Sequence, residues 1–197
     1  MKRKGLQFAT ILLSSMPLAA FAHTGHGESG LLAGLLHPIT GLDHFLALLA
    51  IGIWAVLLKN GGRKNAALQV PVAFLLALLF GASMALWGAS IPMVETGIAT
   101  SVLLLGLLLV AGKSLPLLAT LPITVSFALV HGFAHGTEMP LSVNIAAYLF
   151  GFLLSSAMLI LCGSVFATVM LKAKQTKAVV PISGGAIALS GMMLLVV

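Results

Sequence analysis

Charged residues are scarce in this sequence. Ten Lys and Arg and four Asp and Glu occur among 197 residues, so 7% of the chain is charged, whereas 60% is hydrophobic. A soluble domain carries about a quarter charged residues, because water must solvate its surface. So few charges exclude a water-facing globule of this length, and most of the surface is expected to face lipid.

Cysteine is also nearly absent. Cys162 has no second cysteine in the chain, so no internal disulfide can form. It lies within an apolar run, where a lone cysteine usually acts as a small apolar side chain. We therefore give it no part in the predicted chemistry.

A nucleotide-binding pattern is missing too. Gly112, Lys113 and Ser114 resemble the end of a phosphate-binding loop, but the glycine required five residues before Gly112 is Leu107. The segment also lies at a predicted helix end. We expect no nucleotide among the partners of this chain, so that any transport is passive, ion-coupled or driven by another subunit.

The first residues have the pattern of a cleaved signal peptide. A basic stretch at 2–4 precedes an apolar run at 6–18, and Ala20 and Ala22 provide the small residues that signal peptidase reads. We predict that residues 1–22 are removed and that residues 23–197 form a single transmembrane domain; the alternative is an uncleaved first anchor. Cleavage lowers the formal net charge from +6 to +3, because three basic residues and no acidic residue are lost. The basic balance is thus no sign of a nucleic-acid partner.

Long apolar segments fill the rest of the chain. Each is close to the roughly 20 residues that a helix needs to cross the hydrocarbon core. The sequence therefore predicts an all-α fold, a polytopic transmembrane helix bundle with about six spans after removal of the signal peptide. The fifth segment is too long for a single crossing and is expected to include an extra turn or a short interfacial piece. Residues 31–36 are likewise expected to lie at the membrane interface before the first span. The six segments are 38–58, 68–88, 92–112, 115–134, 141–171 and 179–197.

The basic residues predict how the bundle is oriented. All seven that remain after cleavage follow the first, third and fifth segments, and these alternate loops lie on one side of the membrane. The positive-inside rule assigns that side to the cytoplasm. We therefore expect a bacterial inner-membrane protein with both mature termini in the periplasm. The seven residues are Lys59, Arg63, Lys64, Lys113, Lys172, Lys174 and Lys177.

The acidic residues gather on the opposite side. Glu28, Asp43, Glu95 and Glu138 all fall at or near the predicted periplasmic ends of the segments. Acidic residues contribute little to topology, so this segregation needs another cause. An entrance for a cation on the periplasmic side would provide one.

A first cluster of ligand-type residues lies at the start of the first span. His37 is followed by Pro38, which suits the first turn of a helix because its missing N–H would be unbonded there anyway. We predict a helix that begins at Pro38 and is capped by His37, with His44 about 10 Å further along the axis. Asp43 is then an oxygen ligand or the hydrogen-bond partner of an imidazole.

A second cluster lies at the end of the fourth span. His131, His135 and Glu138 are spaced i, i+4, i+7, which places them on one face of a helix. Because the first and fourth spans run in opposite directions, both clusters are expected at the periplasmic end. Four imidazoles and two carboxylates there suit a borderline divalent ion, Ni²⁺, Co²⁺, Cu²⁺ or Zn²⁺. The predicted metal ligands are His37, Asp43, His44, His131, His135 and Glu138.

The two clusters resemble a known family. His37-Pro-x-x-Gly-x-Asp43-His44, followed by Trp54, and His131-Gly-x-Ala-His135-Gly-x-Glu138 are similar to the two signature motifs of the HupE/UreJ family. The resemblance covers essentially the whole chain. It implies a small permease that takes up nickel for hydrogenase or urease, with the six predicted ligands as functional residues and metallocentre-assembly proteins as downstream partners. The ion would be cargo, and no permanently bound cofactor is expected.

Two further expectations complete the prediction. Cleavage after Ala22 would make His23 the first residue, and its amine and imidazole could then capture a metal together with His26.

The alternatives to a transporter are a membrane-embedded metal-dependent hydrolase that uses His131, His135 and Glu138, and a metal-binding accessory or sensor protein. We favour the transporter over an enzyme.

Overall fold

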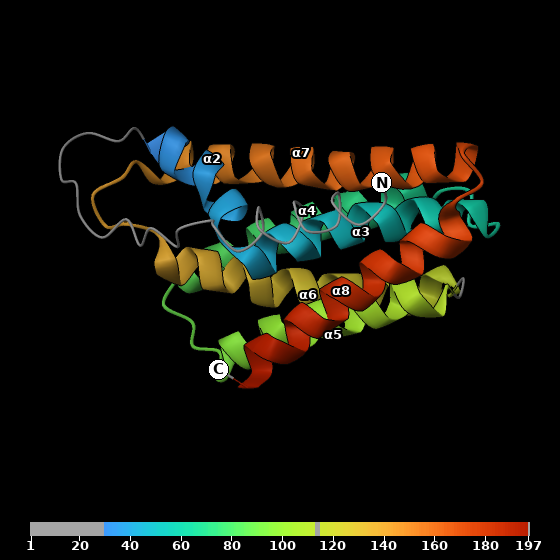
Figure 1. The fold of residues 1–197 in the computed structure, drawn as a ribbon. Helices are drawn as coiled ribbons and strands as arrows, with labels where there is room; N and C mark the ends of the chain where they lie inside the picture. Colours follow the sequence, from blue (N-terminus) through green and yellow to red (C-terminus); the bar gives the residue numbers. More distant parts are fainter. Residues whose placement is uncertain (1–29, 113–114, 197) are drawn as a thin grey trace, which may run out of the picture.

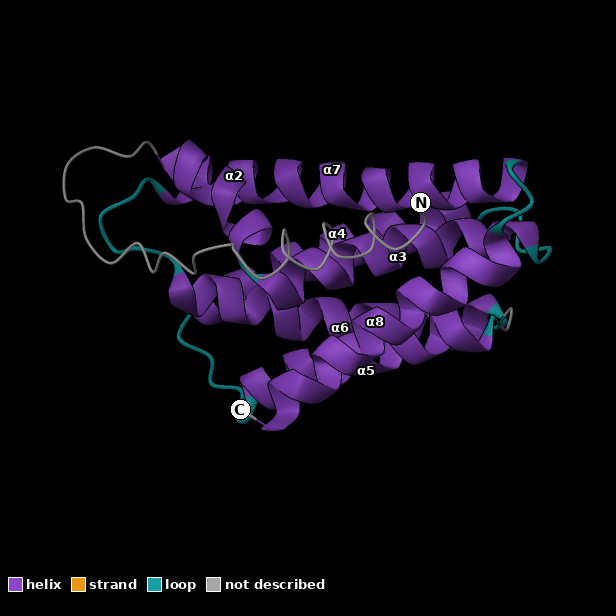
Figure 2. Ribbon diagram, viewed as in Figure 1, coloured by secondary structure: helices purple, strands orange, loops and turns teal. Residues whose placement is uncertain are grey.

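The computed structural model describes residues 30–112 and 115–196. The predicted signal peptide, His23, His26, Lys113 and Ser114 lie outside the described residues. Within them the regular secondary structure consists of α-helices joined by loops (Figure 2), as the predicted all-α fold requires. Six of the helices are long and apolar enough to span a membrane, which confirms the predicted polytopic bundle. The helices are α2 (Gly30–Thr40), α3 (Leu42–Asn60), α4 (Ala66–Leu86), α5 (Val94–Ala111), α6 (Leu117–Glu138), α7 (Ile145–Lys172) and α8 (Thr176–Val196).

The short helix α2 precedes the first span, in the region where an interfacial segment was predicted. It lies beside the beginning of α7 (Figure 1). The contact is close because Gly34 has no side chain: a Cβ atom there would collide with the backbone carbonyl oxygen of Tyr148. Gly151 of α7 fits against the carbonyl oxygen of Leu31 in the same way. Small residues permit such approaches between apolar helices.

The fifth predicted segment is a single helix, α7, of 28 residues. Its first turn is fixed by Asn144, whose side-chain oxygen accepts a hydrogen bond from the backbone N–H of Ala147 at 2.9 Å. A helix of this length extends about 42 Å, more than the roughly 30 Å of a hydrocarbon core. The surplus length is therefore helical, as the predicted extra turn requires.

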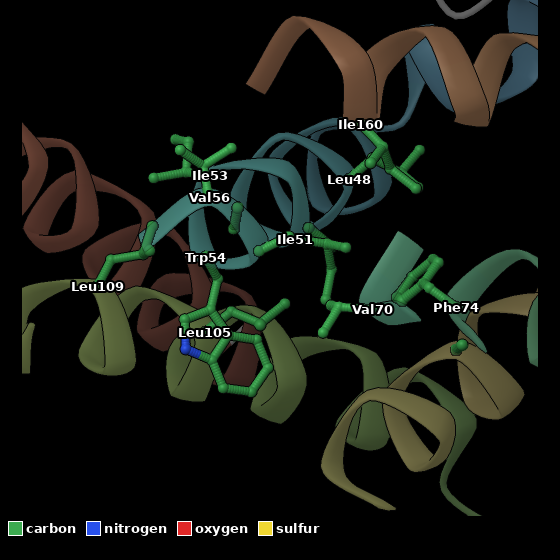
Figure 3. Close-up of a cluster of buried hydrophobic side chains, with 14 of the residues drawn as sticks. Leu48, Ile51, Ile53, Trp54, Val56, Val70, Phe74, Leu105, Leu109 and Ile160 are labelled. Carbon is green, nitrogen blue, oxygen red and sulfur yellow. The ribbon is translucent and has the colours of Figure 1, made fainter. Parts of the chain in front are cut away.

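Helix α3 forms the centre of the bundle. It packs against α4, α5 and α7. In its most apolar stretch of 18 residues 56% is buried, a larger share than in any other candidate span. Around it lies a cluster of buried apolar side chains, in which Trp54 lies beside Leu105 (Figure 3). The pairs α4–α6 and α5–α8 pack alongside (Figure 1).

The two ends of the bundle differ in charge. The described basic residues lie where α3 and α7 end and where α4 and α8 begin; they are Lys59, Arg63, Lys64, Lys172, Lys174 and Lys177. We call this the basic end. Asp43, Glu95 and Glu138 lie at the opposite end, where α3 and α5 begin and α6 ends. We call it the acidic end.

Candidate metal centre

The two predicted clusters meet at the acidic end. Asp43 and His44 lie in the first turn of α3, and His131, His135 and Glu138 lie in the last turns of α6. The i, i+4, i+7 spacing on α6 therefore directs its three groups toward the beginning of α3. Because α3 and α6 run in opposite directions, the antiparallel arrangement expected from the sequence brings the clusters together.

The local structure around Pro38 differs from the prediction. Helix α2 continues through Pro38 to Thr40, and the first span begins only at Leu42, with Gly41 as its N-cap. The extended backbone of Gly41, with φ −81° and ψ 114°, separates the two helices. His37 therefore lies in the last turn of α2 and does not cap the first span. The prediction of one continuous helix from Pro38 was wrong.

This break brings His37 back over the site. The His37 and His44 ring centroids are 6.4 Å apart, whereas seven residues of one helix would separate them by about 10 Å along the axis. The side chain of Thr40 donates to the carbonyl oxygens of Leu36 and His37 at 3.2 and 3.1 Å, which closes the end of α2. The turn thus adds an imidazole from a second helix to the groups of α3 and α6.

His37, His135 and Glu138 form a compact ligand group. Each offers one ligand atom, and these atoms lie within 4.8 Å of one another. Nε2 of His37 is 3.0 Å from Oε2 of Glu138, and the His37 and His135 ring centroids are 4.6 Å apart. Two imidazoles and a carboxylate suit a borderline divalent ion. Since His37 and Glu138 are partly exposed and His135 is buried, the group spans the boundary between surface and interior.

A cavity of about 240 Å³ opens beside this group. We call it the open cavity; its lining residues are His37, Thr40, Gly41, Asp43, His44 and Glu138. Asp43 faces the cavity but lies outside the three-ligand group. Its Oδ1 accepts a hydrogen bond from the backbone N–H of His44 at 2.8 Å, and lies 3.8 Å from Nε2 of His44. Asp43 therefore adds negative charge to the cavity and orients the first turn of α3.

His131 is held in a chain of buried hydrogen bonds. The hydroxyl of Ser101 donates to the carbonyl oxygen of Ile98 at 2.7 Å, which leaves its oxygen to accept from Nε2–H of His131, also at 2.7 Å. His131 then carries its hydrogen on Nε2, and its Nδ1 accepts from Nδ1–H of His44 at 2.8 Å. Both ring nitrogens of His131 are therefore occupied, whereas Nε2 of His44 keeps a free lone pair.

Beneath the open cavity lies a second, closed pocket. Its polar lining consists of His44, His131, His135 and Ser156, and its apolar lining consists of Leu48, Phe74, Leu78 and Phe152. It is too narrow to admit a water molecule. His44 lines both the open cavity and the closed pocket, and its ring centroid is 3.8 Å from that of His135. His44 therefore lies between the two spaces.

Sequence reasoning missed Ser101, Tyr148 and Ser156. Ser101 of α5 bonds to His131, Tyr148 of α7 has its ring centroid 5.9 Å from that of His37, and Ser156 of α7 lines the closed pocket. Single serines are common in apolar helices and carry no spacing pattern. Only the packing of α5 and α7 against the two motif helices shows their place in the site.

Close helix packing supports the site from behind. Gly132 lies between His131 and His135 along α6, and a Cβ atom there would collide with the backbone carbonyl oxygen of Leu78 in α4. Gly136 packs in the same way against Ala82 of α4. The side of α6 that carries no ligands is thereby pressed against α4, which fixes the direction of its histidines.

Comparison with known proteins agrees with this geometry. The family profile described as "HupE / UreJ protein" matches residues 11–194. Protein HupE of Rhizobium leguminosarum bv. viciae is 39% identical over 187 residues, which cover 95% of each chain. No solved structure matches. The profile match includes both motifs, five complete candidate spans and all but the last two residues of α8, and the chain therefore belongs to the HupE/UreJ family.

Proposed function

We propose that this protein is a permease that takes up a divalent transition-metal ion, with nickel as the first candidate, through the bacterial inner membrane. The ligand group of His37, His135 and Glu138, whose ligand atoms lie within 4.8 Å of one another, carries this proposal. It lies beside an open cavity in a bundle with six candidate spans. Membership of a nickel and cobalt transport accessory family supports the same class of cargo.

The ion-binding step follows from the chemistry of the three groups. A hydrated divalent cation is attracted to Asp43 and Glu138 and exchanges waters for imidazole nitrogen and carboxylate oxygen. Imidazole favours Ni²⁺, Co²⁺, Cu²⁺ and Zn²⁺ over Mg²⁺ and Ca²⁺, which prefer oxygen ligands. Binding breaks the hydrogen bond between His37 and Glu138, because Nε2 of His37 must give up the hydrogen that it shares with the carboxylate before its lone pair can face the ion. The protein thus exchanges an internal hydrogen bond for a metal complex.

The orientation belongs to the proposal. The six described basic residues lie at one end, which the positive-inside rule assigns to the cytoplasm, so the open cavity faces the periplasm. Reporter fusions after Lys64 and Lys174 should behave as cytoplasmic, and a fusion after Pro140 as periplasmic. A periplasmic signal from a reporter after either lysine would contradict this orientation and the proposed direction of uptake.

Flux into sealed vesicles tests the function. Purified protein in liposomes should accumulate Ni²⁺ with time, and the variant His135→Ala should not. Thr137→Ala is the matched control, since Thr137 lies on the same turn and bonds only to the carbonyl oxygen of Ala134 among the described residues. Tight binding without accumulation would favour a fixed metal site, as an accessory or sensor protein requires. Parallel assays with Co²⁺, Cu²⁺ and Zn²⁺ identify the preferred ion.

A further inference from the structure

Two residues that line the closed pocket have buried polar atoms without a hydrogen-bond partner. Nδ1 of His135 and Oγ of Ser156 are buried, and neither has a hydrogen-bond partner. The two side chains are 2% and 0% exposed, and both line the closed pocket. A buried polar atom without a partner destabilises the fold, so such atoms call for a ligand or another specific reason.

Ser156 is unusual among the neighbouring hydroxyls. The adjacent Ser155 donates to the carbonyl oxygen of Phe152, and Ser164 of the same helix donates to the carbonyl oxygens of Ile160 and Gly52. These bonds are the ordinary way for a serine to satisfy its hydroxyl inside an apolar helix. Ser156 makes no such bond, and it is the serine of α7 that lines the closed pocket.

We propose that the closed pocket is a second coordination position for the transported ion, formed by His131, His135 and Ser156 and reached past His44. This inference rests on the proposed function and extends it from a binding site to a path. His135 belongs to the ligand group at the open cavity and also lines the closed pocket, and its buried Nδ1 has no hydrogen-bond partner. Its imidazole can therefore serve as a ligand at the two positions in turn.

The hydrogen bond between His44 and His131 closes the way to this position. Their Nδ1 atoms are 2.8 Å apart and share one hydrogen. When the His44 ring turns, Nδ1 of His131 loses its hydrogen-bond donor and becomes a free lone pair, while the bond from Nε2 to Ser101 keeps the ring in place. Two imidazole nitrogens and one hydroxyl oxygen then face the pocket. An ion that has exchanged its water shell for these ligands needs less room than a hydrated one.

The position is occupied after the first, not together with it. The same imidazole cannot hold two ions through its two nitrogens while it carries a hydrogen. One ion per chain is therefore expected at any moment. The apolar lining of Leu48, Phe74 and Leu78 below the polar atoms lacks ligands, so a further opening of the helices must precede release.

A cysteine substitution gives this position a spectroscopic signature. In a Cys162→Ser background, which removes the natural thiol, we expect Ser156→Cys protein titrated with Co²⁺ or Ni²⁺ to show a thiolate-to-metal charge-transfer band in the near ultraviolet. Ser155→Cys is the matched control and should show none, because that side chain does not line the pocket. A band in Ser156→Cys alone supports the inner position even if the wild type fails to transport.

Uptake kinetics provide a second test that does not depend on the cysteine. Ser156→Ala should lower the maximal rate of Ni²⁺ uptake by about 10-fold and change KM by less than 2-fold, whereas Ser155→Ala should leave both unchanged. If the wild type transports Ni²⁺ while Ser156→Cys shows no band and Ser156→Ala transports normally, the inner position is overturned and the proposed function stands. If no vesicle accumulates metal, the proposed function fails by itself.

Discussion

The open cavity and the closed pocket are built from the same kind of residue but suit different tasks. The open cavity has two carboxylates, partly exposed ligands and a volume of about 240 Å³. The closed pocket has no carboxylate, buried imidazoles and no space for water. Charge and access favour capture of a hydrated cation, whereas neutral buried ligands favour passage of a dehydrated one. The proposed path therefore makes acquisition and passage separate steps, and different variants should affect each.

The strongest test of this comparison is the residue that belongs to both spaces. His135→Ala removes a ligand at the open cavity and the unbonded Nδ1 of the closed pocket. We expect Ni²⁺ uptake to fall by at least about 100-fold, since even outer-shell partners of a metal cost 10–100-fold. Quantitative blotting should show normal amounts in the membrane. Uptake within 3-fold of wild type would mean that the imidazoles are packing residues.

A variant at the open cavity alone should affect capture. Glu138→Gln keeps the shape of the side chain but removes the anionic ligand, so we expect KM for Ni²⁺ to rise about 10–100-fold with a nearly unchanged maximal rate. Glu95→Gln is the control, because Glu95 lies at the same end but outside the ligand group. If both variants raise KM equally, the acidic end attracts cations by charge alone.

A variant that loosens His131 should affect passage. Ser101→Ala deletes the hydrogen bond to Nε2 of His131, which contributes about 1 kcal/mol. The maximal rate of uptake should therefore fall roughly 5-fold at constant KM. Ser101→Thr retains a hydroxyl and should restore most of the rate. Ser190→Ala, which removes an exposed hydroxyl of α8, should have no effect. A failure of threonine to rescue would point to a steric role for Ser101.

The smallest effect is expected from the N-terminal segment. If His23 and His26 capture metal before the open cavity does, the double alanine variant should raise KM a few-fold and leave the maximal rate intact. Uptake assays at nanomolar Ni²⁺ would detect this change. Unaltered uptake there, or N-terminal sequencing that finds residues 1–22 still attached, would remove the capture step.

The spans and the meeting of the two motifs could be predicted because both depend on local patterns. Apolar length gave the six spans, and the i, i+4, i+7 spacing gave the ligand face of α6. The break at Gly41 could not be predicted, because a proline near a helix start is equally compatible with a helix that begins there. In the structure α2 packs against α7 through Gly34, Pro38 lies inside α2, and Nε2 of His37 is 3.0 Å from Oε2 of Glu138.

The division of the six predicted ligands into two groups also depends on tertiary structure. The two motifs alone do not distinguish the six predicted ligands from one another; they are His37, Asp43, His44, His131, His135 and Glu138. In the structure three of them form one ligand group, Asp43 faces the same cavity, and His131 is engaged by His44 and Ser101. Ser101 and Ser156 come from helices without any motif, so no pattern along the chain could assign them.

X-ray absorption of Ni²⁺ bound to the purified protein in lipid nanodiscs identifies the ligands of the ion. We expect nickel coordinated by two imidazoles and at least one carboxylate oxygen. We also expect His37→Ala to lose one imidazole, while Thr137→Ala, altered next to Glu138 in a side chain that bonds to the carbonyl oxygen of Ala134, keeps both. A spectrum without imidazole scattering, or one that is identical in wild type and His37→Ala, would contradict the assignment of the site.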